Sequence, residues 1–256
     1  MASFTILTLN TWKCDGDYVR RLQLMADALA ALDPDVIMLQ EVFASADGAW
    51  DTSVHLAEVL DMRRAYHPAR FKKRCVNGTP SDSYSGLAVL SHGRQRDHHA
   101  FPLPGTDGDG DRWAQSIVIE TEGQPVRVVN THLTHVDGGV EGGGADGDGA
   151  RLKQARRMIE VLGTGPKDIP TIVGGDFNAE LEDPAMQWIL AQDAMTLHRI
   201  DMNRPTLSCC ERCVDHLLVA PPLGVSQVMR VMDQPANDHT LPSDHHGIMA
   251  RLVFPN

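Results

Sequence analysis

The stretch whose residue types are best suited to catalysis is residues 174–180 (GGDFNAE). It follows a short apolar, β-rich run at 169–173. Two glycines end that run, so the pattern predicts a buried strand that delivers an acid and an amide at its carboxyl end. Asp176 and Asn178 are two residues apart and can point to the same side of an extended chain. A carboxylate beside a neutral amide suits water activation and phosphate binding. The alternative is a strand end followed by an ordinary Asx turn.

The same pattern recurs along the chain, where a short apolar run predicts a buried strand and a polar group follows it. The groups at these other strands are Asn10, Glu41, His132 and Asp215, and Asp244 and His245 stand just before the last predicted strand. Strand ends that gather at one edge of a sheet build a polar cleft able to hold a metal ion. The sequence therefore predicts a single site assembled from distant segments.

The elements that would position these groups begin in the order strand, helix, strand, which predicts an α/β sheet. Strands are predicted at residues 4–9, 36–40, 85–91, 113–120, 126–130, 169–173, 214–220 and 247–254. Helices are predicted at residues 19–32, 51–61, 151–162 and 183–192. Residues 63–74 form a basic segment, and residues 94–111 are expected to be a loop because they contain two prolines and a Gly/Asp cluster.

Length and charge limit the classes of function. The 256 residues contain no repeat and no convincing linker, so a single domain over residues 1–256 is expected. A net charge of −11 argues against a broad basic surface for duplex nucleic acid. It leaves room for a local basic patch or a small phosphorylated substrate.

Cysteine use and hydropathy bear on location. The five cysteines are an odd number, and the chain shows neither a signal-like leader nor a run of ~18 apolar residues. These features predict a cytoplasmic protein with reduced thiols and no stable membrane association. The cluster of Cys209, Cys210 and Cys213 resembles a zinc fragment, but no second pair stands at zinc spacing, so ordinary buried or free thiols are the alternative.

Residues 137–150 are rich in glycine and acids and predict a flexible surface loop. A calcium loop is rejected because the EF-hand spacing and its terminal Glu are missing. A mobile lid over the site is a second interpretation, because the loop begins close to His132.

Seven short motifs, taken in order, resemble those of the endonuclease/exonuclease/phosphatase superfamily, which has the deoxyribonuclease-I-like fold. They are Leu9-Asn10-Thr11, Leu39-Gln40-Glu41-Val42, residues 84–91, Asn130-Thr131-His132-Leu133, residues 175–179, Val214-Asp215-His216 and Ser243-Asp244-His245. The resemblance implies a four-layer α/β sandwich, with two packed mixed β-sheets flanked by helices. It also implies Mg²⁺-dependent cleavage of phosphoesters.

The resemblance implies a metal site at Glu41, with Asn10 beside it and Asp244 as a further acid near the metal. Carboxylate and amide oxygens suit Mg²⁺, and Mn²⁺ is expected to substitute for it. Without the resemblance, Glu41 could equally be a solvated helix cap.

The catalytic roles also follow from the resemblance. His245 is the expected general base, and Asp215 would orient it and stabilise its protonated form. Asp176 would position the attacking water, and Asn178 would donate to a phosphoryl oxygen. His132 would bind another oxygen or protonate the leaving group as an imidazolium.

His132 argues against a role in the repair of abasic DNA, because the branches of this family with that role usually carry Tyr at the corresponding position. The basic segment 63–74 is ordinarily a solvated charged face, but it could anchor a substrate phosphate near Tyr84. We therefore expect a phosphodiesterase that acts on a small-molecule or nucleic-acid phosphoester. A nuclease and a non-catalytic binding relative are the alternatives, and the oligomeric state stays open.

Overall fold

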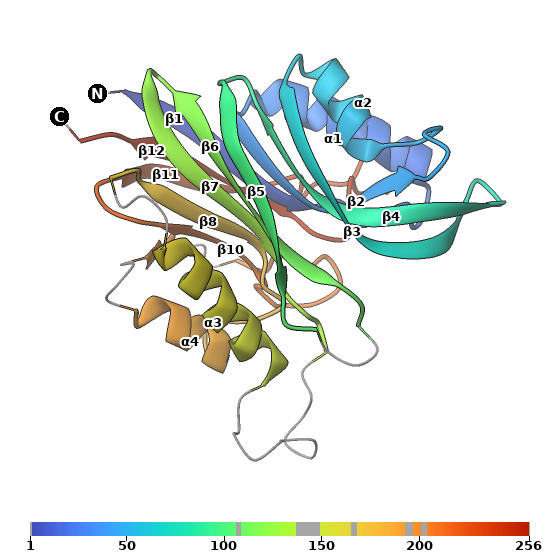
Figure 1. Cartoon of the computed structure of the whole chain (residues 1–256). Helices are drawn as coiled ribbons and strands as arrows, with labels where there is room; N and C mark the ends of the chain where they lie inside the picture. Colours follow the sequence, from blue (N-terminus) through green and yellow to red (C-terminus); the bar gives the residue numbers. More distant parts are fainter. Residues whose placement is uncertain are drawn as a thin grey trace.

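Within the described residues, two six-stranded sheets pack face to face and carry helices on their outer surfaces (Figure 1). The computed structural model describes residues 2–105, 109–136, 149–164, 168–192, 197–200 and 204–255. The predicted flexible loop and lid at 137–150 lies outside these ranges, apart from its last two residues.

The first sheet has the strand order β11-β12-β1-β2-β4-β3. Its strands are β1 (Ser3–Asn10), β2 (Val36–Ser45), β3 (Arg63–Val76), β4 (Thr79–Ser91), β11 (Gly224–Val231) and β12 (Gly247–Val253). The strands β1 and β2 run parallel and the other neighbours run antiparallel, so the sheet is mixed. Its outer face is covered by α1 (Tyr18–Leu32) and α2 (Thr52–Val59) (Figure 1).

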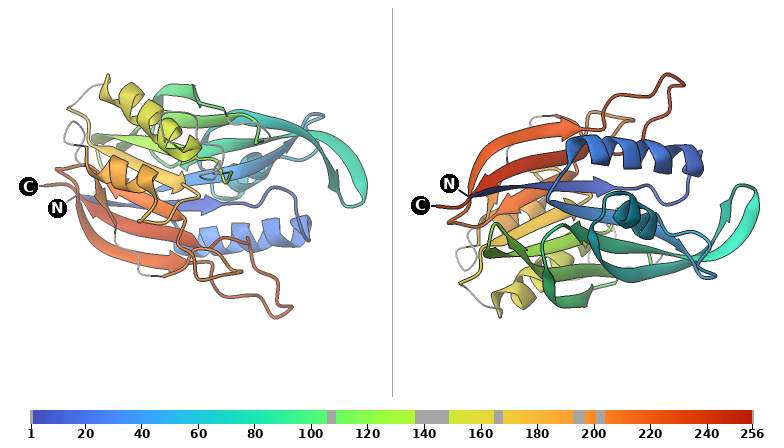
Figure 2. Two further views of the ribbon diagram at one scale, coloured as in Figure 1. Left: turned by 90° about the horizontal axis from the view of Figure 1, so that it is seen from below. Right: turned by 90° about the horizontal axis from the view of Figure 1, so that it is seen from above.

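The second sheet has the order β5-β6-β7-β8-β10-β9. Its strands are β5 (Gln95–Leu103), β6 (Arg112–Thr121), β7 (Gln124–His132), β8 (Thr171–Asp176), β9 (His198–Arg199) and β10 (Asp215–Val219). Here β7 and β8 are the parallel pair. The helices α3 (Ala150–Gly163) and α4 (Pro184–Leu190) cover the outer face, and Figure 2 shows both sheets between the two helix pairs.

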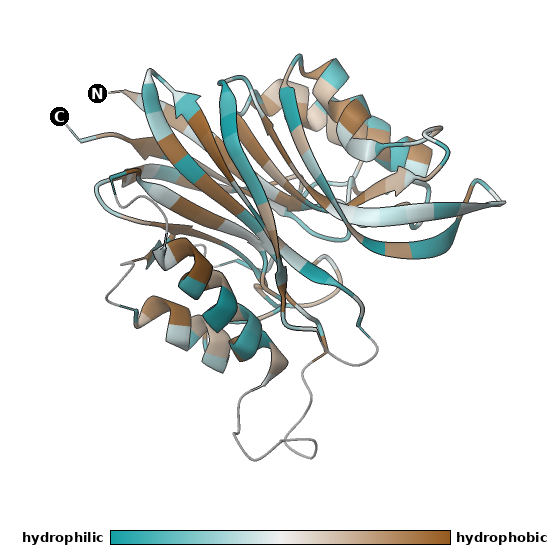
Figure 3. Cartoon of the chain, in the orientation of Figure 1, coloured by the Kyte–Doolittle hydropathy of each residue, from teal (hydrophilic) through white to brown (hydrophobic). Residues whose placement is uncertain are grey.

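Three apolar layers hold the four structural layers together. The layer between the sheets draws on both of them, for example Ile6 and Val89 from the first and Val128 and Ile172 from the second. The other two layers lie beneath the helix pairs. The ribbon coloured by hydropathy shows apolar segments along the strands (Figure 3). The structure thus confirms the predicted four-layer sandwich.

Helix α1 shows how local sequence sets an element's limits. The Asp17 side chain accepts from the Arg20 amide at its start, and Asp33 ends it in the left-handed conformation with φ 45°. Leu22, Met25 and Leu29, at helical spacing, are buried against the first sheet.

One expectation about an edge segment was wrong, and a second edge strand had no predicted element. Residues 94–111 were expected to be a loop, but residues 95–103 form β5, an edge strand of the second sheet in which Phe101 and Leu103 are buried. The basic segment 63–74 belongs to β3, an edge strand of the first sheet, whose hairpin with β4 extends beyond the rest of that sheet (Figure 2). Edge strands tolerate charge and proline because one side of their backbone pairs with no other strand.

No helix in the described part of the chain is long and apolar enough to cross a membrane.

Candidate active site

All eight predicted site residues converge at one edge of the interface between the two sheets. The first sheet and the segment before β12 contribute Asn10, Glu41, Asp244 and His245, and the second sheet and the turn after β8 contribute His132, Asp176, Asn178 and Asp215. Seven of them line one cavity of about 270 Å³. The eighth, Asp215, is fully buried behind His245.

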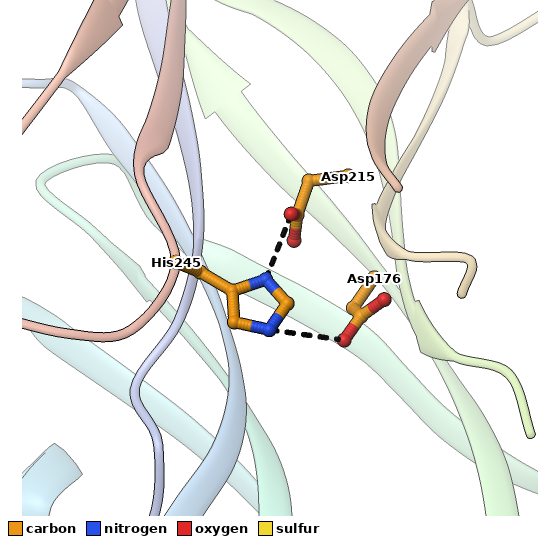
Figure 4. Close-up of side chains that lie close together, drawn as sticks. All are labelled: Asp176, Asp215 and His245. Atoms are coloured by element: carbon orange, nitrogen blue, oxygen red, sulfur yellow. Dashed lines mark hydrogen bonds and ion pairs between the residues drawn. The ribbon is translucent and has the colours of Figure 1, made fainter. Parts of the chain in front are cut away.

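A hydrogen bond between Asp215 and His245 links the two sheets. The Asp215 Oδ2 and His245 Nδ1 atoms are 2.8 Å apart, and His245 Nε2 lies 3.8 Å from Oδ2 of Asp176 (Figure 4). The backbone amide of Asp215 donates to Thr206 Oγ1, which fixes the start of β10. An imidazole held by a carboxylate at Nδ1 presents Nε2 for proton transfer, as in the hydrolase triads.

Asp176 occupies the centre of the site. Its Oδ2 accepts a 2.9 Å hydrogen bond from Asn10 Nδ2 and lies 3.4 Å from His132 Nε2. Its Oδ1 accepts from the backbone amide of Asn178, whose φ is 50°. One carboxylate oxygen of Asp176 thus forms the Asx turn, while the other lies beside Asn10 and His132 in the cavity lining.

Gly175 explains how His132 comes to lie beside Asp176. It has a φ of 142°, and a Cβ built on it would lie 1.9 Å from the carbonyl oxygen of Thr131. Only glycine permits this close approach of β8 to β7. The parallel register then sets His132 directly opposite Asp176.

The buried charges shift the titration of these groups. Burial alone would lower the pKa of His245, but the charge and hydrogen bond of Asp215, with the charge of Asp176, raise it to about 10. Burial and the nearby Asp215 raise the pKa of Asp176 to about 7. Burial and the positive charge of Arg112 lower the pKa of His132 well below its ordinary value. The lowered pKa favours the neutral imidazole of His132, whereas the resemblance implied the imidazolium.

Glu41 reaches the cavity through a β-bulge. Two residues of β2, Gln40 and Glu41, stand opposite one position of β4, and Glu41 adopts a φ of 53°. The strand continues to Ser45 rather than ending at Gln40 as predicted. The Glu41 carboxylate lies 2.7 Å from the ammonium group of Lys13, a residue that the sequence did not single out.

The donor set around Glu41 fits a hard divalent cation. Asp244 lines the same cavity, and its pKa is raised by burial and, to a smaller extent, by the negative charge of Glu41. Two carboxylates that repel one another are stabilised by a cation, and Lys13 supplies part of that charge in this structure. The carbonyl oxygen of the Asn10 side chain accepts from the Trp12 amide, so Asn10 mainly orients Asp176 here.

A second set of possible metal ligands overlaps the hydrogen-bonded groups. Asp176, Asp215 and His245 each offer an atom within 4.8 Å of the others. A cation among them would compete with the bond between Asp215 and His245 Nδ1. Glu41 and Asp244 offer two carboxylates in the same cavity outside this hydrogen-bonded set.

Two buried polar networks hold the site and escaped the sequence analysis. The Arg21 side chain, 1% exposed, donates to five backbone carbonyls, those of Thr11, Trp12, Lys13, Asp15 and Pro242. It thus fixes the segments that carry Asn10 and Asp244. Between the sheets, Gln40 donates to the Asn130 side chain over 2.7 Å, and Asn130 donates to two carbonyls of the first sheet.

Two histidines next to motif residues, and the cysteines, lie outside this cavity. His216 points to the Ala179 carbonyl, 2.7 Å away, and His246 borders a separate pocket. All five cysteines are free thiols, and Cys209 and Cys210 have their sulfur atoms 3.5 Å apart. In the described ranges the cysteines belong to no cluster of three potential metal ligands.

Solved structures share this architecture over the whole chain. An endonuclease/exonuclease/phosphatase from Bacteroides vulgatus has a TM-score of 0.77 at 18% identity, with 100% of each chain covered. The human Nocturnin catalytic domain with bound sulfate anion has a TM-score of 0.76 at 19% identity, covering 99% of this chain and 94% of that one. A mannosyl-6-phosphatase from Bacteroides thetaiotaomicron has a TM-score of 0.69 at 19% identity, covering 98% and 100%. At such low sequence identity, these TM-scores show a common fold and no more.

Sequence comparison is decisive for the family. No curated protein matches the chain. The profile of the Endonuclease/Exonuclease/phosphatase family, however, matches residues 7–245 and so spans every residue of the site. The chain belongs to the endonuclease/exonuclease/phosphatase family, whose members are enzymes that hydrolyse phosphoester bonds.

Proposed function

We propose that the chain is a Mg²⁺-dependent phosphoester hydrolase, and specifically a phosphodiesterase. The observation that carries the proposal is the Asp215–His245 hydrogen bond, with His245 Nε2 directed at Asp176 in the cavity that also holds Glu41 and Asp244. A non-catalytic binding relative would need none of these coupled acid and base groups.

Water activation falls to Asp176 and His245. His245 Nε2 and Asp176 Oδ2 are 3.8 Å apart, so one water can contact both. The raised pKa keeps His245 as an imidazolium at neutral pH, so the Asp176 carboxylate of the pair accepts the proton that the water loses as it attacks phosphorus. Asp215 stabilises the imidazolium form of His245, and Asn10 holds the Asp176 carboxylate in place. The hydrogen bonds of both supporting residues, Asp215 and Asn10, join one sheet to the other. The positions of His245 and Asp176 therefore depend on how the two sheets pack.

His132 and Asn178, which line the cavity together with Asp176, bind the phosphoryl oxygens. As a neutral imidazole, His132 binds an oxygen by hydrogen bonding rather than by charge. One N–H of the Asn178 side chain donates to the Leu133 carbonyl over 3.0 Å, which orients the amide and leaves its second N–H for substrate.

The cation would be held by Glu41 and Asp244, with Asn10 next to them. When bound, a divalent ion supplies positive charge that stabilises the phosphoryl and leaving oxygens. All-oxygen ligation suits Mg²⁺, and Mn²⁺ is expected to replace it.

The free thiols are consistent with a cytoplasmic location.

A panel of substrates tests the proposal. Bis-p-nitrophenyl phosphate, p-nitrophenyl phosphate, plasmid DNA, RNA and sphingomyelin are each assayed with Mg²⁺ and with EDTA. We expect Mg²⁺-dependent hydrolysis of the diester that is lost in His245→Ala. Plasmid nicking lost in the same variant would favour a nuclease, and no turnover of any substrate would favour a binding protein.

A further inference from the structure

A second group of charges lies in the same cavity, next to the catalytic residues but outside the chemistry proposed above. Its centre is Asp109, which is fully buried. The Asp109 carboxylate forms two hydrogen bonds with Arg112, of 2.9 Å to Nε and 2.8 Å to Nη2, and accepts from Thr134 Oγ1. These bonds and the charge of Arg112 outweigh burial and hold the pKa of Asp109 below its ordinary value, so it is ionised.

The single negative charge of Asp109 lies beside two positively charged arginine side chains, so the group keeps a net positive charge. Arg70 Nη1 lies 3.9 Å from Asp109 Oδ1, and His135 Nδ1 lies 3.1 Å from the same oxygen. One carboxylate thus faces two guanidinium groups and an imidazole. Arg70, Arg112 and His135 all line the cavity. Asp111 also borders it, but that residue is exposed, and no ion pair joins it to either arginine in the described part of the chain.

The backbone is shaped for this arrangement. Gly110 has a φ of 79°, and a Cβ built there would lie 2.9 Å from Nε and 3.1 Å from Cδ of Arg70. The missing side chain lets Arg70 lie across the loop next to Arg112. Arg70 stands just after the β-bulge between Pro68 and Arg70, on the strand edge that borders the cavity.

The charged group lies close to the reaction centre. Arg112 is near enough to lower the pKa of His132, whose Nε2 is 3.4 Å from Asp176. Arg112 is only 10% exposed, so water screens its charge little, and two of its nitrogens are already fixed by Asp109. Fixed guanidinium groups are well suited to phosphate oxygens.

We propose that Arg70 and Arg112, held by Asp109, bind a second phosphate group of the substrate, so that the enzyme acts on small phosphoesters that carry another phosphate. The inference rests on the proposed hydrolase function and names its substrate class. The cavity of about 270 Å³ is at the low end for small-molecule sites and suits a compact bisphosphorylated compound. The net charge of −11 disfavours long nucleic acids as the source of that phosphate.

A matched pair of chromogenic esters tests the proposal. The p-nitrophenyl ester of thymidine 5′-phosphate is compared with the same ester bearing a 3′-phosphate, and p-nitrophenol release gives kcat/KM for each. We expect the 3′-phosphate to raise kcat/KM of the wild type by about tenfold or more. The ratio should fall toward one in Arg70→Gln and Arg112→Gln, and it should persist in Lys73→Gln, which removes an exposed charge from the same strand.

Binding without turnover separates this inference from the proposed function. Calorimetry in EDTA should show that thymidine 3′,5′-bisphosphate binds about tenfold more tightly than thymidine 5′-phosphate, and that Arg70→Gln removes the difference. Preferential binding without hydrolysis of either ester would overturn the hydrolase and keep the subsite. Hydrolysis of both esters at equal rates, or a gain seen with a twelve-nucleotide DNA strand and not with the bisphosphate, would overturn the subsite.

Discussion

Asp215 and His245 belong to opposite sides of the sandwich and are joined by a 2.8 Å hydrogen bond. Asp215 opens β10 of the second sheet, whereas His245 precedes β12 of the first. The Asn10–Asp176 bond makes a second crossing close by. The catalytic arrangement therefore exists only where the two sheets meet, and a change that shifts one sheet against the other would disturb it.

Loss of the acid–base pair should abolish turnover while leaving the fold intact. His245→Ala and Asp176→Asn are each expected to lower kcat by about 10²–10⁴-fold, because no other group replaces the lost proton acceptor. Steady-state kinetics on bis-p-nitrophenyl phosphate measures the loss, and circular dichroism checks the fold.

The neighbouring His246 offers a matched control. It borders another pocket, so His246→Asn should leave kcat within a few-fold of the wild type. Equal losses in His246→Asn and His245→Ala would mean that disruption of the segment, rather than loss of proton transfer, explains the effect.

Arg21 should stabilise the fold far more than its neighbour Arg20 does. Arg21→Met leaves five backbone carbonyls without their donor and is expected to lower the free energy of unfolding by about 3 kcal/mol or more. Arg20→Met removes only an exposed pair with Asp238 and should cost about 0.5 kcal/mol or less. Urea unfolding measures both, and comparable losses would contradict the role given to Arg21.

The same urea experiment addresses domain organisation. The prediction of one domain over residues 1–256 requires a single cooperative transition seen alike by fluorescence and circular dichroism. Two separate transitions would contradict it.

Buried His216 should make the protein acid-sensitive. Burial lowers its pKa from 6.5 to about 4, so the unfolded chain binds a proton that the folded chain refuses. The resulting stability is complete above pH 6.5 and is lost as the pH falls from 6.5 to about 4, in total about 3 kcal/mol. Because the raised pKa of Asp176 stabilises the fold over the same range, the loss is measured as the difference in unfolding free energy between the wild type and a variant without His216.

Substitution at His216 identifies the source of that slope. His216→Asn removes the titrating group and should flatten stability between pH 6.5 and 4, whereas the same change at exposed His198 should not. An unchanged slope in His216→Asn would assign the acid sensitivity to other groups.

The fold was predictable because its central strands are short apolar runs that end in polar residues. Buried strands such as β1 and β8 carry that signal in consecutive residues. Edge strands lack this signal. The strands β3, β5 and β11 were not predicted, because their buried positions are few and interrupted by charged residues. Their pairing is decided by neighbours distant in sequence.

Motif order predicted that these eight residues would gather in one place, but it did not predict their environment. Nothing local indicates that Arg21 is buried, or that Lys13 pairs with Glu41. The lowered pKa of His132 depends on its burial between the sheets and on the charge of Arg112, which only the folded structure reveals. The roles assigned to the eight residues remain predictions that the experiments above examine.

A Mg²⁺ titration of diester hydrolysis tests most directly whether Glu41 binds the metal and Asp215 instead supports His245. Wild type, Glu41→Gln and Asp215→Asn are compared for the metal concentration at half-maximal rate and for the rate at saturating metal. We predict that Glu41→Gln raises the required Mg²⁺ by about tenfold or more, whereas Asp215→Asn lowers the saturated rate at an unchanged metal requirement. A raised metal requirement in Asp215→Asn, with Glu41→Gln indifferent to Mg²⁺, would contradict the account and place the cation among Asp176, Asp215 and His245.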